Sequence, residues 1–69
     1  MESIHRALDI IRNQSKSDSA KVLRRLMDAL KHDHPIRPSE LDALGYDDCQ
    51  LALQLILDWR VARHYFARL

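Results

Sequence analysis

The stretch that decides the fold runs from Asp47 to Leu69 and reads DDCQLALQLILDWRVARHYFARL. Asp47 and Gln50 have the spacing of a helix N-cap and its capping box, and Tyr46 before them can act as a hydrophobic staple. No Gly or Pro follows. An apolar stripe with helical spacing runs along the stretch at Leu51, Leu55, Trp59, Ala62, Phe66 and Leu69. This pattern predicts a single helix over residues 47–68, about 33 Å long, as the spine of the fold.

The first half of this predicted helix carries a second apolar flank beside the stripe. Its members are Ala52, Leu53, Ile56 and Leu57. A helix that is apolar on more than one side must be covered on more than one side. If the rest of this short chain does not suffice, a second copy or another protein covers it. The sequence therefore predicts a homodimer, a protein partner, or both.

The remaining sequence predicts three shorter helices, over residues 3–12, 19–31 and 39–44. The first two have apolar residues at helical spacing, and Ser17, Asp18 and Ser19 are equally suitable N-caps for the second. Pro35 requires the second helix to end before it. The expected fold is all-α, a small bundle of three to four helices in a single domain over residues 1–69.

Composition narrows the class of protein further. Apolar residues make up 46% of the chain and charged residues 30%, which argues against disorder. One Gly and two Pro argue against a turn-rich β fold, and the single Cys excludes a disulfide framework. The longest apolar run, residues 51–57, is too short to span a membrane, and no secretory signal begins the sequence. We expect a soluble cytoplasmic protein.

Charge is unevenly distributed along the chain. Residues 1–37 carry eight basic and five acidic side chains, residues 38–59 carry five acidic and no Lys or Arg, and residues 60–69 carry three Arg. Each block has two interpretations. The charges complement helix dipoles inside the domain, or they form a polarised surface for a charged partner.

No pattern in the sequence predicts catalysis or metal binding. Cys49 has acidic neighbours and no base nearby in sequence, and Gly45 is the only glycine, so no phosphate-binding loop is present. His32 and His34 flank Asp33 in one segment, but no ligand spacing typical of a metal site accompanies them. We expect a protein that is not an enzyme, with no cofactor, no metal and no small-molecule substrate.

Nucleic acid is the alternative partner. The order of the predicted helices resembles a helix-turn-helix arrangement, with residues 47–68 as the recognition helix. Its first turn would present Asp47 and Asp48 to phosphates, which disfavours this function. The residues that could contact phosphates or an acidic partner are Arg60, Arg63, His64 and Arg68. On a continuous helix, Arg60, His64 and Arg68 would form one ridge.

The favoured function is a non-enzymatic protein–protein interaction or regulatory module that self-associates through its C-terminal helix. The candidate interface residues are Leu53, Ile56, Leu57, Trp59, Tyr65 and Phe66. Aromatic side chains dominate the binding energy of many interfaces. Positions in the core are nevertheless the favoured interpretation for Trp59 and Phe66, which lie on the main stripe, whereas Leu53 and Tyr65 lie beside it.

Overall fold

The computed structural model describes residues 2–69, and these residues form four α-helices and one 3-10 helix. In chain order the elements are α1 (Glu2–Asn13), α2 (Asp18–His32), the 3-10 helix η1 (Pro38–Ala43), α3 (Tyr46–Val61) and α4 (Arg63–Ala67). No strand occurs within the described range, so the predicted all-α class is confirmed there. Met1 lies outside it.

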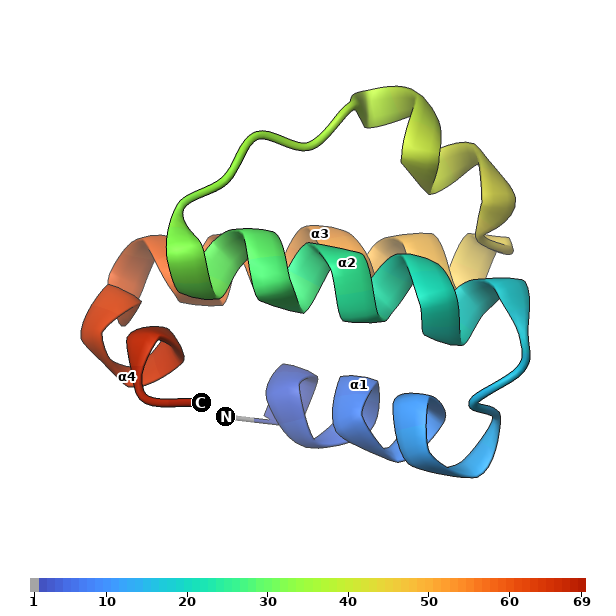
Figure 1. Ribbon diagram of the computed structural model, residues 1–69, viewed down its shortest axis with the longest axis horizontal. Helices are drawn as coiled ribbons and strands as arrows, with labels where there is room; N and C mark the ends of the chain where they lie inside the picture. The colour runs from blue at the N-terminus through green and yellow to red at the C-terminus, as the bar shows by residue number, and fades with distance from the viewer. Residues whose placement is uncertain (1) are drawn as a thin grey trace.

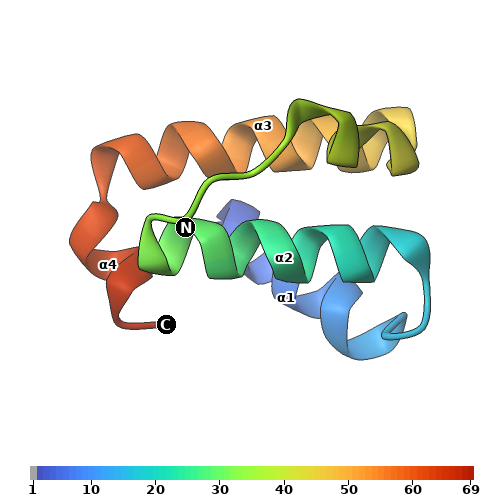
Figure 2. The same ribbon diagram turned by 45° about the horizontal axis from the view of Figure 1, so that its top comes forward.

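Helix α2 is the centre of the arrangement, since it packs against α1, α3, α4 and η1. Figure 1 shows α1 along one side of α2, and η1 on the opposite side, at the end of a connector that arches away from the helix. Helix α3 runs alongside α2, and α4 folds back across one end of the bundle (Figure 2). The sequence predicts the C-terminal segment as the central spine of the fold. In the structure α2 occupies that position instead.

The core lies where α1, α2, α3 and α4 meet. Its buried members are Ile4, Ala7, Leu23, Leu26, Leu51, Ala52, Leu55 and Phe66. Partly buried side chains close its edge, among them Ile36 from the connector between α2 and η1. Phe66 is the largest fully buried side chain, so the short helix α4 contributes a principal core residue.

The first two helices include the ranges that the sequence predicts for them, and both ends of α2 are capped. Ser17 is the N-cap of α2, and its hydroxyl accepts a hydrogen bond of 3.0 Å from the backbone N–H of Ala20. At the other end, Asp33 adopts the left-handed conformation with φ 57° and ψ 43°, and its N–H donates to the carbonyl of Ala29.

The C-terminal segment differs from the prediction of one helix over residues 47–68. Helix α3 ends at Val61, Ala62 takes φ −130° and ψ 51°, and α4 follows at a different angle. A straight helix of that length would measure about 33 Å, whereas the longest extent of the molecule is 28 Å. The break at Ala62 turns Phe66 back into the core, where it is fully buried. Burying a side chain of this size is worth about 1.5–3 kcal/mol, enough to offset a few lost helical hydrogen bonds.

The segment before α3 also differs in detail from the prediction. Residues 38–43 form a 3-10 helix instead of an α-helix, and Gly45, not Asp47, is the N-cap of α3. Asp47 therefore lies inside the first turn, where a carboxylate still complements the helix dipole. Tyr46 opens the helix and is 78% exposed, so it does not act as a buried staple.

Candidate functional site

Helix α3 exposes a second apolar face in addition to the one it buries. Four large side chains on it are exposed: Tyr46 at 78%, Leu53 at 47%, Leu57 at 56% and Val61 at 83%. They are spaced seven, four and four residues apart, so they occupy an arc of about 80° around the helix axis. We call these four residues the α3 stripe. It runs from the first residue of the helix to the last.

The α3 stripe is not needed for the internal core. The opposite face of α3 buries Leu51, Ala52 and Leu55, which pack among α1, α2 and α4. The other helices therefore cover one side of α3 and leave the other side without a cover. Apolar side chains at helical spacing on an uncovered face are typical of a surface that packs against another helix.

One flank of the α3 stripe is polar and faces α1. Gln50 donates a hydrogen bond of 3.0 Å to the Tyr46 hydroxyl, and Gln54 donates one of 3.0 Å to Asp58. Ser3 is a buried residue of α1, and its hydroxyl also donates a hydrogen bond to the Asp58 carboxylate. Because Ser3 and then Gln54 donate to the charged form, the pKa of Asp58 lies below its ordinary value of 3.8. These contacts hold the polar flank in place.

A cavity of about 490 Å³ lies between this flank and α1. Its lining residues are Glu2, Ser3, Arg6, Gln50, Leu51, Gln54 and Asp58. Ser3 has no histidine or lysine in this lining to take its proton, and its hydroxyl already donates to a carboxylate. The hydrogen bond between Ser3 and Asp58 joins α1 to α3.

The other flank of the α3 stripe contains Cys49, Ile56 and Arg60, which follow one another at helical spacing. Ile56 is partly buried against the core, and Cys49 is a half-buried free thiol. Arg60 is exposed in the last turn. Of the candidate interface residues from the sequence, the structure therefore places Leu53 and Leu57 together on the α3 stripe and Ile56 at its edge.

The aromatic candidates lie elsewhere. Trp59 packs against the core, and the guanidinium of Arg63 lies 4.6 Å from the centre of its ring, in cation–π contact. Phe66 is fully buried and belongs to the core, so it is not available to a partner. Tyr65 is 42% exposed but lies on α4, beyond the break.

The break at Ala62 also overturns the predicted basic ridge. Arg60 belongs to α3, His64 belongs to α4, and Arg68 lies just after α4. All three side chains are exposed, but they no longer share the face of one helix. Sequence reasoning placed them on a continuous helix because no Gly or Pro marks the break.

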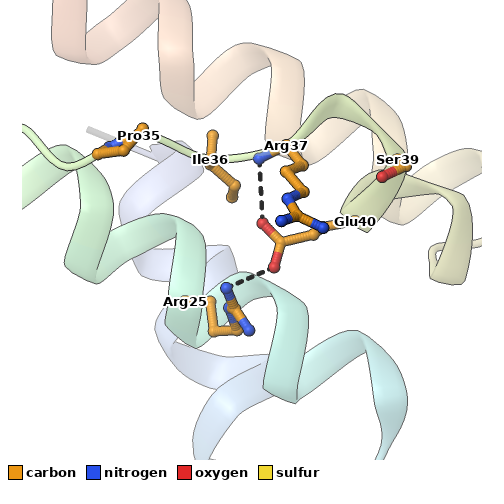
Figure 3. Close-up of a pocket in the computed structure, with 6 residues that line it drawn as sticks. All are labelled: Arg25, Pro35, Ile36, Arg37, Ser39 and Glu40. Carbon is orange, nitrogen blue, oxygen red and sulfur yellow. Dashed lines mark hydrogen bonds and ion pairs between the residues drawn. The ribbon is translucent and has the colours of Figure 1, made fainter.

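A larger cavity, of about 540 Å³, lies between α2 and η1, and sequence reasoning did not predict it. Figure 3 shows its lining, in which the Glu40 carboxylate stands between two arginines. One oxygen of Glu40 lies 2.5 Å from the guanidinium of Arg25, and the other accepts a 3.2 Å hydrogen bond from the Arg37 backbone N–H. Both carboxylate oxygens are thus occupied, and the contact fastens η1 to α2.

The histidines do not form a metal site among residues 2–69, where no group of three or more suitable ligands converges. His32 and His34 stack with their ring centres 5.4 Å apart, and His32 lies 3.4 Å from the Asp28 carboxylate. Within the same residues, no helix has the length and apolar character that a membrane span requires.

Comparison of the chain with protein-family models, with curated proteins and with solved structures found no match.

Proposed function

We propose that this chain is a small, non-enzymatic protein–protein interaction module that associates with a second copy of itself through the α3 stripe. The observation that carries the proposal is the exposure of Tyr46, Leu53, Leu57 and Val61 along one face of a helix whose other face is core. The free thiol of the single cysteine, Cys49, supports a reducing compartment such as the cytoplasm.

The energetics favour association of moderate strength. Covering the exposed part of each stripe leucine contributes on the order of 1 kcal/mol, since full burial of a leucine is worth about 1.5–3 kcal/mol. In a symmetric dimer each of these side chains is covered in both copies, so its contribution to the binding free energy is doubled. The cost of immobilising two molecules offsets much of this gain, so we expect a dimer whose population depends on protein concentration.

Nucleic acid is the competing partner for this fold. As a recognition helix, α3 would present Asp47 and Asp48 in its first turn and apolar side chains along its exposed face. Neither suits phosphates or base edges. Arg60 precedes the break, whereas His64 and Arg68 follow it, so the three exposed side chains do not belong to one helix.

The proposal is tested by replacing Leu57 with Glu. The side chain is 56% exposed, so the variant should keep its helical circular dichroism while its mass by sedimentation falls from dimer to monomer. Leu57→Met is the matched conservative variant and should still associate. Ser15→Glu adds the same charge in the exposed segment between α1 and α2, and it should also leave the dimer intact.

Two results would contradict the proposal. An unmodified chain that sediments as a monomer up to millimolar concentration would remove self-association altogether. Retention on a DNA or RNA column, lost steeply as salt rises, would favour the nucleic-acid alternative instead.

A further inference from the structure

The two ends of α3 carry opposite charge. Asp47 and Asp48 occupy its first turn, and the exposed Asp42 of η1 precedes them. Arg60 occupies its last turn, and Arg63 follows directly after the break. The arc of α3 that holds the α3 stripe contains one further residue, the exposed and uncharged Gln50. The exposed charges beside the α3 stripe are therefore Asp47 at the start of the helix and Arg60 at its end, because Asp48 and Arg63 lie toward Trp59, away from the α3 stripe.

We propose that two copies of the chain pair antiparallel along α3, with the acidic start of each helix against the basic end of the other. This inference rests on the self-association proposed above and specifies its geometry. Antiparallel pairing brings opposite charges together at both ends, whereas parallel pairing would set acid against acid and base against base. Antiparallel helix dipoles favour the same orientation.

The apolar residues also suit this orientation. When two copies of α3 are aligned antiparallel at the middle of the α3 stripe, Tyr46 of one copy lies opposite Val61 of the other. In this register the Leu53 side chains of the two copies meet at the two-fold axis, and Leu57 of each copy falls opposite Gln50 of the other. The two most exposed side chains of the α3 stripe, Tyr46 at 78% and Val61 at 83%, would thereby cover each other.

The flanks of α3 add a specific contact between charges. Gln50, Gln54 and Asp58 mark the flank that faces α1, and Arg60 lies on the opposite flank. Figure 1 shows η1 on the side of α2 opposite α1. Since the other flank of α3 faces α1, we place η1 nearer the Arg60 flank. A two-fold axis perpendicular to both helices brings equivalent flanks together. Arg60 of one copy would then approach η1 of the other, where Asp42 is exposed.

Disulfide trapping tests the orientation directly. In a Cys49→Ser background, Tyr46→Cys and Val61→Cys are prepared as separate chains and oxidised alone or mixed. Antiparallel pairing predicts covalent dimers in the mixture and none from either chain alone. Parallel pairing predicts covalent dimers from each chain alone, and that result would overturn the inference. The absence of any trapped dimer, while both reduced variants still sediment as dimers, would overturn it as well.

Charge exchange gives a second test that leaves the α3 stripe intact. Asp42→Arg and Arg60→Glu alone should each weaken self-association about three- to tenfold at low salt, because each places like charges together twice. Both changes in one chain should restore the affinity of the unmodified protein. A double variant no tighter than the single variants would overturn the inference. An unmodified chain that never dimerises would instead contradict the proposed function.

Discussion

The Ser3 hydroxyl donates a hydrogen bond to the Asp58 carboxylate and joins the first turn of α1 to the last turns of α3. Ser3 is buried, whereas Asp58 lies at the edge of the polar flank and also accepts from Gln54. The contact connects residues that are 55 positions apart in the chain. It therefore closes the bundle at the end where α4 turns back.

We expect Ser3→Ala to lower the melting temperature at neutral pH, and Ser15→Ala, in the exposed α1–α2 connection, to leave it unchanged. The pKa of Asp58 is lowered in the folded state, so its contribution is complete above the ordinary value of 3.8 and is lost as the pH falls through the lower folded value. The difference between unmodified chain and Ser3→Ala should shrink accordingly in urea unfolding below that pH. A constant difference down to strong acid would contradict this assignment.

Phe66 and its neighbour Tyr65 should respond very differently to truncation. Phe66 is fully buried, so Phe66→Ala should cost about 3–5 kcal/mol of unfolding free energy, a large share of what a small domain has. Tyr65→Ala should cost much less, because Tyr65 is 42% exposed. Thermal melts followed by circular dichroism make the comparison. If Phe66→Ala does not fold, Phe66→Leu should still show a lower melting temperature than Tyr65→Ala.

The N-cap of α2 gives a prediction with a close internal control. Ser17→Ala removes the acceptor for the Ala20 N–H and should cost about 1 kcal/mol, or about 4–8 °C in melting temperature. Ser15→Ala removes an exposed hydroxyl two residues earlier and should have no measurable effect. Equal melting temperatures for the two variants would show that the Ser17 cap contributes nothing.

The Arg25–Glu40 ion pair should contribute little to global stability. The Arg25 side chain is 70% exposed, so a double-mutant cycle with Arg25→Ala and Glu40→Ala should give a coupling of at most about 1 kcal/mol. The effect should be local, with faster hydrogen exchange at η1 than at α2 in Glu40→Ala. A coupling well above this value would identify η1 as part of the stable core.

Periodicity and end signals predict α1 and α2, because their apolar residues lie on one face and Pro35 requires α2 to end before it. The sequence leaves the N-cap of α2 open among three residues, and the structure selects Ser17. The same reasoning failed at Ala62. Alanine favours helix, and its departure from helical geometry is imposed by the burial of Phe66 against other helices. A tertiary cause of this kind leaves no local signal in the sequence.

The site was predicted in part. Leu53 and Leu57 were identified because they make α3 apolar on a second side, and the structure exposes both. Tyr46 and Val61 were missed as members of the same face. The sequence pattern assigns Tyr46 to a staple outside the helix, and Val61 is not among the candidate interface residues. Their spacing from Leu53 and Leu57 was visible in the sequence, but the position of the helix start and of the break was needed to interpret it.

The break at Ala62 fixes how far any assembly along α3 can extend. Sixteen residues give about 24 Å of straight helix, and beyond Val61 the chain bends away toward the core. Two antiparallel copies would use this whole length, and neither would offer an overhang on which a third molecule could continue. Such an assembly is finite, so its average mass should level off at two chains as concentration rises, with no growth into fibres.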